Sequence, residues 1–296
     1  MIDMGKLLQN KKAIVLFMAP AVLFFAAIVI APVFLSGYYS LLDWDGMGEK
    51  VFIGFDNYVR LFTDTGDRFL LALNNSLLIA VFSLLIQLPM GMLFAILLSN
   101  GVRGERFFIT VFFIPVIIST VAIGQLWGKI YNPDYGLLNT ILRGAGLEHL
   151  ARAWLGDKDT VLAAVITPII WQYIGYYMLL FYSSIKSVSA DLFDAARIDG
   201  ASRVQTAFRV TIPIIRPMIK TCLIFSLVGS FKTYDMVCVL TDGGPAHASE
   251  VPTTLMVWTI FKRNQYGYGS AMAVIIVLIC FSLYLLVQKF FKTDNE

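Results

Sequence analysis

The chain has 296 residues, of which 58% are hydrophobic and only 15% are charged, and its mean hydropathy is +0.73. This composition excludes a water-soluble globular domain and predicts an integral membrane protein. The formal net charge of +3 comes from basic residues scattered among loops, which excludes a basic face for binding nucleic acid.

Six apolar runs have the length that a helix needs to cross a bilayer, about 20 residues. The first run continues past residues 19–21, which look like a cleavage site, so we interpret it as a retained span and not as a signal peptide. We expect an all-α, polytopic fold with one membrane domain, 13–290, between an amino-terminal segment, 1–12, and a tail, 291–296. The expected spans are 13–35, 74–98, 107–127, 161–183, 217–236 and 270–287.

Two spans carry polar groups at the depth of the hydrocarbon. Gln87 and Pro89 lie inside the second span, where such residues face protein or a water-filled path instead of lipid. For these two residues, packing between helices is the preferred interpretation.

The fourth span carries a second polar group, near its middle: Gln172, Tyr173, Tyr176 and Tyr177. Aromatic residues with polar tips are commonest at membrane interfaces, but these tyrosines are not near one. Their rings would stack on the apolar faces of a sugar while the hydroxyl and amide groups bind its polar edge. The alternative is a set of tyrosines buried between helices with satisfied hydroxyl groups.

The fifth span contains Lys232 and Asp235, whose spacing of three residues predicts a pair on one helical face. Lys232 lies about 18 Å along the helix axis from Lys220, past the middle of the membrane. Charged residues at that depth face the interior of a helix bundle. A translocation path and a structural ion pair are both compatible with this position.

A polar stretch separates the fourth and fifth spans. Ser189 predicts a helix cap, and Gly200 stands where a helix end needs a positive φ. Ser202 and Gln205 have the spacing of a capping box, and Pro213 marks where the second helix must end or change. We therefore expect a helix, a sharp glycine turn and a second helix.

Ala195 and Ala196 give the first of these helices a flank with almost no side-chain bulk, which the backbone of another protein can approach. An ordinary solvated loop is the alternative. The stretch resembles the EAA loop of permease subunits in binding-protein-dependent ABC importers, E-A-A-x3-G-x9-I-x-L-P. Here the matching positions are Asp194-Ala195-Ala196, Gly200 and Val210-Thr211-Ile212-Pro213, with Asp for Glu, Val for Ile and Ile for Leu.

This resemblance implies a cytoplasmic coupling loop, 184–216, that docks an ATPase. The residues implied in the coupling are Asp194, Ala195, Ala196, Asp199, Gly200 and Pro213. Three further phrases resemble the carbohydrate-uptake branch of the same family: 54–58 (GFDNY), 132–139 (NPDYGLLN) and 241–245 (TDGGP).

The same resemblance implies a first-type permease subunit in a bacterial or archaeal cytoplasmic membrane, surrounded by lipid. Its implied partners are a second permease subunit, two copies of an ATP-binding subunit and an extracytoplasmic sugar-binding protein. ATP and Mg²⁺ would be bound by the ATP-binding partner, and this chain would need no cofactor.

Basic residues are about twice as dense on one set of loops and ends as on the other. By the positive-inside rule the denser set is cytoplasmic. Six spans then place both termini in the cytoplasm and the coupling loop beside ATP. The denser set consists of 1–12, 99–106, 183–220 and 288–296.

The sequence contains no phosphate loop, no H-E-x-x-H and no nucleophile in a recognisable setting, so we expect a transport subunit and not an enzyme. Three cysteines without C-x-x-C spacing and two histidines predict no metal site.

An alternative function is a secondary sugar carrier driven by an ion gradient, with Lys232 and Asp235 as its coupling pair. Six spans without an inverted repeat argue against it, and a membrane scaffold without transport is a third possibility.

Overall fold

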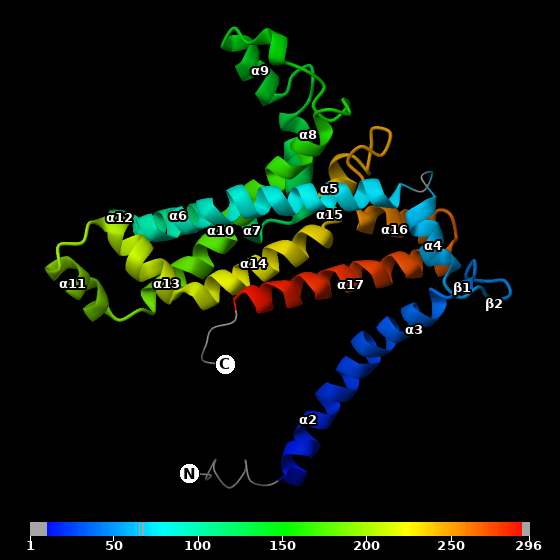
Figure 1. Ribbon diagram of the computed structural model, residues 1–296. Coiled ribbons are helices and arrows are strands. Elements are labelled where there is room, and N and C mark those ends of the chain that lie inside the picture. Colours follow the sequence, from blue (N-terminus) through cyan, green and yellow to red (C-terminus); the bar gives the residue numbers. More distant parts are fainter. Residues whose placement is uncertain (1–10, 65, 67, 292–296) are drawn as a thin grey trace. The chain divides into compact units, whose positions relative to one another are not determined.

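The computed structural model describes residues 11–64, 66 and 68–291, most of them helical (Figure 1). The predicted amino-terminal segment and tail lie largely outside the described residues. Residue contacts divide the chain into two compact units. Unit 1 holds the described residues up to Thr63 together with Met256–Ile275, and unit 2 holds the rest.

Unit 1 contains one long helix, a small hairpin and a short helix. Its elements are α2 (Lys11–Phe25), the π-helical turn η1 (Ala26–Ile30), α3 (Ala31–Tyr39), β1 (Leu42–Asp43), β2 (Val51–Phe52) and α4 (Asp56–Thr63). The two strands are antiparallel, with Leu42 opposite Phe52. Asp45 closes the hairpin by accepting hydrogen bonds from the backbone N–H groups of Gly48 (2.6 Å) and Met47 (3.0 Å), and these lower the pKa of its carboxyl.

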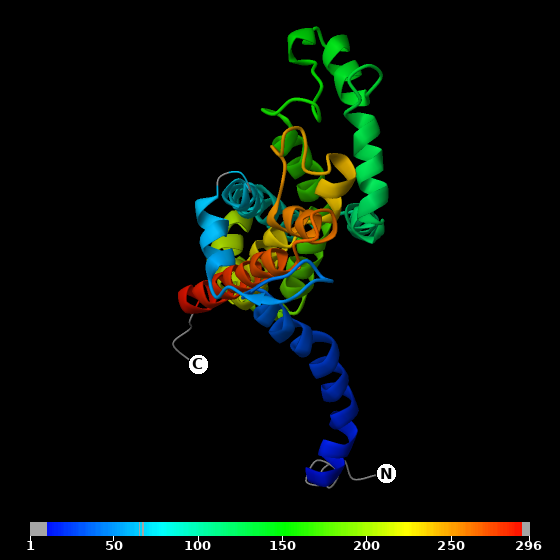
Figure 2. The ribbon, with the colours of Figure 1, turned by 90° about the vertical axis from the view of Figure 1, so that its right-hand side faces the viewer.

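Unit 2 is a helical bundle with an arm. Its elements are α5 (Phe69–Phe82), η3 (Ser83–Gln87), α6 (Leu88–Ser99), α7 (Glu105–Ile117), α8 (Thr120–Ile130), α9 (Leu137–Gly144), η4 (Glu148–Leu150), α10 (Val161–Lys186), α11 (Ala190–Ile198), α12 (Arg203–Thr206), η5 (Ala207–Thr211), α13 (Ile212–Ile214), α14 (Arg216–Phe231) and α15 (Asp235–Leu240). Two more helices, α16 (Pro252–Phe261) and α17 (Tyr266–Phe290), have residues in both units. Figure 2 shows α8 carrying α9 away from α7 to form the arm.

Four continuous helices are long and apolar enough to cross a membrane: Ile14–Tyr39, Phe69–Ser99, Val161–Lys186 and Tyr266–Phe290. Two further candidates are bent pairs, and if each counts as one span the described residues hold six. The predicted all-α, polytopic fold is confirmed, although each continuous helix is longer than its predicted span.

The third and fifth spans differ from the straight helices that the sequence predicts. α7 and α8 meet at 96° because Ile118 and Ser119 are extended, with ψ of 139° and 132°. The fifth span differs at its end, because α14 stops at Phe231 instead of continuing to residue 236. The 74° bend between Arg203–Ile214 and α14 lies before this span, in the predicted coupling loop.

Each of the three π-helical turns precedes a proline by the same distance. η1 ends two residues before Pro32, η3 two residues before Pro89 and η5 two residues before Pro213. A proline ring clashes with the carbonyl four residues earlier in an α-helix, and a wider turn moves that carbonyl away. The helix that contains Pro213 ends one residue later, at Ile214, close to where the sequence predicts that it must end or change.

α10 packs between α6 and α7 in unit 2. A Cβ on Gly175 would lie 1.8 Å from the carbonyl oxygen of Phe112 in α7, and one on Gly91 would lie 3.1 Å from the backbone nitrogen of Met178. Small residues of this kind let helix backbones approach closely within a membrane. Gln87 adds hydrogen bonds from its buried Nε2 to the carbonyls of Ile169 and Ile170 (3.2 and 3.3 Å), which confirms its role in helix packing.

Candidate functional site

The loop between the fourth and fifth spans begins with the capped helix that the sequence predicts. The Ser189 hydroxyl accepts a hydrogen bond from the Asp191 backbone at the start of α11 (3.3 Å). Gly200 follows the helix with φ +74°. Its N–H donates to Arg197 (3.0 Å), and the next N–H, of Ala201, donates to Ala196 (2.9 Å). These two bonds form a Schellman motif, so the turn satisfies the last carbonyls of α11.

The second helix starts with the predicted capping box. The Ser202 hydroxyl accepts from the Gln205 backbone (3.3 Å), and the Gln205 side chain accepts from the Ser202 backbone (2.8 Å). α12 then continues through η5 into α13. The predicted helix, glycine turn and second helix are therefore all present.

The loop also presents five large, exposed apolar side chains, the last of them Ile214 in α13. The four on α11, α12 and η5, which we call the coupling face, are Leu192, Ile198, Val204 and Phe208. Ile198 is 86% exposed. Our sequence analysis missed this group, although apolar residues inside an otherwise polar stretch are a visible signal of a binding surface. The coupling face is available to a partner of matching apolar character.

The residues predicted to dock a partner do not all face outward. Asp194, Ala195, Asp199 and Pro213 are exposed, whereas Ala196 is only 8% exposed and packs inside its own chain. The Asp194 carboxylate accepts from Arg197 one turn later, at 3.0 Å. Both side chains are solvated, so this pair contributes little to stability.

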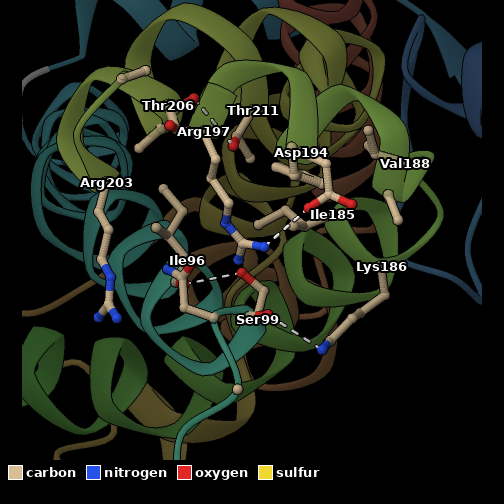
Figure 3. A pocket seen from close by; sticks show the side chains of 16 residues that line it. Ile96, Ser99, Ile185, Lys186, Val188, Asp194, Arg197, Arg203, Thr206 and Thr211 are labelled. Atoms are coloured by element: carbon tan, nitrogen blue, oxygen red, sulfur yellow. Dashed lines mark hydrogen bonds and ion pairs between the residues drawn. The ribbon is translucent and has the colours of Figure 1, made fainter. Parts of the chain in front are cut away.

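A cavity of about 530 Å³ lies between α11, α12 and the adjoining ends of α6 and α10. Figure 3 shows Arg197 and Lys186 on its wall, with the Lys186 amine reaching the carbonyl of Ser99 (3.3 Å). The same amine lies 3.4 Å from the Glu105 carboxylate at the start of α7. Lys186 thus ties the base of the loop to the turn between α6 and α7.

A second cavity, of about 610 Å³, lies within unit 2 among α5, η3, α8, α10, α14 and α15. The structure brings all six residues of the predicted substrate path to its wall: Gln172, Tyr173, Tyr176, Tyr177, Lys232 and Asp235. Gln87, Thr120 and Ser230 add further polar groups. We call this space the solute cavity.

Gln172 is a buried amide beside the solute cavity. Only 1% of its surface is exposed, and its Nε2 donates at 3.4 Å to the Ile118 carbonyl and the Thr120 hydroxyl. Its Oε1 is buried too and has no hydrogen-bond partner among the described residues. Gln172 therefore joins α10 to the start of α8 and leaves one polar atom unsatisfied beside the cavity.

Lys232 and Asp235 do not form the pair on one helical face that their spacing predicts. Lys232 caps the end of α14, the chain leaves helical geometry at Tyr234, and Asp235 starts α15. No ion pair joins the two side chains in the described part of the chain. The prediction was wrong because it assumed one continuous helix. The alternative function, a carrier driven by an ion gradient, depended on this pair and is therefore less well supported.

Four to six candidate membrane spans among the described residues, a cavity lined by tyrosines and polar side chains, and an exposed helix-turn-helix are the features of a membrane transport subunit. The described residues contain no group of three or more side chains that would hold a metal ion. The chain belongs to the family of inner membrane components of binding-protein-dependent transport systems, whose model matches residues 13–292.

Curated relatives and a solved structure agree with this assignment. The chain is 40% identical to the probable ABC transporter permease protein YurN of Bacillus subtilis, over 97% of this chain and 99% of the relative. It is 31% identical to the diacetylchitobiose uptake system permease protein NgcF of Streptomyces coelicolor, over 89% and 77%. The fold is similar to a chain of a bacterial ABC transporter for alginate import, with a TM-score of 0.83, 22% identity and 99% of both chains covered.

Proposed function

We propose that this chain is one of two permease subunits of an ATP-driven sugar importer in a bacterial or archaeal cytoplasmic membrane. Residues 13–290 form its membrane domain, both termini are cytoplasmic, and the solute cavity is its half of the translocation path. The main observation in support of this proposal is that tyrosine rings, amide groups and a lysine line one cavity of about 610 Å³.

A sugar offers both of the surfaces that such a cavity binds. The C–H faces of its ring pack on aromatic side chains, and its hydroxyl groups donate to exposed acceptors such as the Asp235 carboxylate. Two relatives support this substrate class by name, the diacetylchitobiose permease and the multiple sugar-binding transport system permease MsmF of Streptococcus mutans.

In this proposal, the ATP-binding partner subunits supply the energy for transport. The coupling face docks one of two copies of an ATP-binding subunit, which hold ATP and Mg²⁺, and an extracytoplasmic binding protein delivers the sugar. Gly200 supplies the tight turn, and Ala195 and Asp194 lie at the contact. Asp199 and Pro213 border it, whereas Ala196 supports it from inside.

Movement of the ATP-binding subunits displaces the coupling loop as one rigid element. The Schellman turn at Gly200 and the Lys186 contacts make the loop stiff, so its displacement tilts the attached spans α10 and α14. The permease pair then alternates between inward-facing and outward-facing arrangements, which is a two-state rigid-body switch.

Two substitutions test the coupling and the path separately in the assembled transporter. Ile198→Asp places a charge on the coupling face and should lower uptake at least about tenfold, because a buried unpaired charge costs more than 1.4 kcal/mol. Ile141→Asp, at an exposed position on the arm, is the matched control and should retain uptake. Full uptake by the Ile198→Asp transporter would contradict ATPase docking at this face.

Tyr173→Ala should lower uptake while ATP hydrolysis stimulated by the binding protein persists, since it alters the path and not the coupling. Tyr135→Ala, on the exposed arm, is the control. Uptake into vesicles should require internal ATP and should continue without an ion gradient. Uptake that follows an ion gradient in the absence of ATP would instead support the secondary carrier.

A further inference from the structure

Exposed apolar side chains continue beyond the first span, in residues 47–62. Six of them come from the hairpin and α4: Met47, Val51, Phe52, Phe55, Val59 and Phe62. Exposure of this kind on a segment outside the hydrocarbon marks a contact with a membrane or with another protein.

α4 has two distinct faces. Phe55, just before the helix, Val59 and Phe62 recur at the i, i+4 and i+7 positions and form one exposed stripe. Asn57 and Leu61 lie on the opposite side and are buried. The buried face packs α4 against its own chain, whereas much of each stripe side chain stays exposed.

The buried face fixes α4 to the end of the first span. Asn57 Nδ2 donates to the carbonyls of Ser40 and Leu42, both at 2.9 Å. The Tyr58 and Ser40 hydroxyl groups lie 2.6 Å apart. Ser40 follows Tyr39, the last helical residue of the span, so α4 lies at the depth where the hydrocarbon ends.

Aromatic rings mark the same depth. The rings of Tyr39 and Trp44 are 4.7 Å apart between centroids, and Trp44 is 5.6 Å from Tyr266. Tyrosine and tryptophan gather at the headgroup level of membranes. The Lys50 amine lies 4.5 Å from the Trp44 ring, and a cation at this level suits lipid phosphate groups.

We propose that α4 and the hairpin form an in-plane membrane anchor. The stripe of Phe55, Val59 and Phe62 enters the boundary between headgroups and acyl chains of the extracytoplasmic leaflet, as amphipathic interfacial helices do. Lipid is the occupant that fits, because the Asn57 and Tyr58 contacts hold α4 at the end of the first span, at the level that the aromatic rings mark as the headgroup region. The anchor fixes the tilt of the first span relative to the bilayer.

Spin labels measure this depth directly. A label on Val59→Cys is compared with one on Phe17→Cys, which is exposed on the first span, and one on Lys158→Cys, which is exposed on a polar loop. The three native cysteines are first replaced by serine, and the assembled transporter is placed in vesicles of phosphatidylethanolamine and phosphatidylglycerol. The readout is the ratio of collisions with oxygen, which enters lipid, to collisions with a water-soluble nickel complex.

We expect a ratio at Val59 several-fold higher than at Lys158 and lower than at Phe17, with and without the binding protein. A label on Phe62→Cys should give the same ordering, so that one perturbed site does not decide the result. A ratio at Val59 equal to that at Lys158 means that the stripe faces water and overturns the proposal. Low collision rates with both reagents mean that a protein subunit covers the stripe and overturn it equally.

Discussion

At the scale of single residues, glycines decide where the backbones of unit 2 can meet. The close approach at Gly175 leaves no room for a methyl group, because the obstacle is the backbone of α7 and not a flexible side chain. Gly91 is less crowded, with its nearest contacts at 3.1 Å. The two positions therefore differ in how far the helices must move to accept a larger residue.

We predict that Gly175→Ala destabilises the purified protein more than Gly91→Ala does. Overpacking of this kind costs about 1–3 kcal/mol, which should lower the midpoint of thermal unfolding in detergent. Gly128→Ala in α8 is the control, since a Cβ there meets nothing within 4 Å. Equal midpoints for Gly175→Ala and Gly128→Ala would show that α7 and α10 do not pack as described.

Gly200 matters for its backbone conformation alone, because a Cβ there also meets nothing within 4 Å. Its φ of +74° is costly for a β-branched residue, about 1–2 kcal/mol, and tolerable for asparagine. We predict that Gly200→Val raises the number of ATP molecules hydrolysed per sugar transported, whereas Gly200→Asn leaves it near the wild-type value. Measurements of both rates in vesicles check this, and an unchanged ratio for Gly200→Val would exclude the turn from the coupling.

At the scale of elements, the structure explains which sequence signals were sufficient to predict helix ends, turns and bends. Ser202, Gln205 and Gly200 predicted their caps and turn correctly, because these signals act within a few residues. The bend at Ile118 and Ser119 had no such signal, since Pro115 lies inside a helix that continues past it. The break between Lys232 and Asp235 was also hidden, because the sequence there is compatible with a continuous helix. Six of the residues that line the solute cavity were nevertheless predicted from residue chemistry.

In the arm, one side chain holds α9 to the segment that leads back to α10. Asn139 in α9 is buried and donates to the carbonyls of Pro133 (3.1 Å) and Arg152 (3.0 Å). Its Oδ1 accepts from the Trp154 indole at 2.8 Å. These bonds join α9 to the segment that returns to α10.

We predict that Asn139→Ala loosens residues 145–156 while the membrane bundle stays folded. Losing a buried hydrogen-bonding group costs about 1–3 kcal/mol, and the segment should exchange its amide hydrogens at least several-fold faster. Thr140→Ala is the control, since that hydroxyl bonds only the Gly136 carbonyl in its own helix. Unchanged exchange in Asn139→Ala would mean that other contacts hold the arm.

At the scale of the whole molecule, the charge distribution predicts the direction of insertion. The loop with the coupling face and the turn between α6 and α7 belong to the more basic set, whereas the hairpin and arm belong to the less basic set. The positive-inside rule then predicts a cytoplasmic position for that turn and that loop, and an outside position for the arm. Val102 in the turn and Lys158 between the arm and α10 are both exposed.

A labelling experiment in intact cells checks this orientation. In a chain whose native cysteines are replaced by serine, a membrane-impermeant maleimide should modify Lys158→Cys in whole cells. It should modify Val102→Cys only after the cells are opened. The reverse pattern would invert the topology and remove the coupling loop from ATP.

The π-helical turns place a constraint on how the sequence can diverge. A π turn holds one residue more than an α turn, so losing it rotates every later side chain of the helix by about 100°. Consider a relative that has no proline at the position of Pro89 and an α-helical turn in place of η3. To keep the amide of Gln87 directed at α10, its sequence must lack one residue between Phe69 and Gln87. We therefore expect substitutions at this proline and single-residue gaps before it to occur together in an alignment.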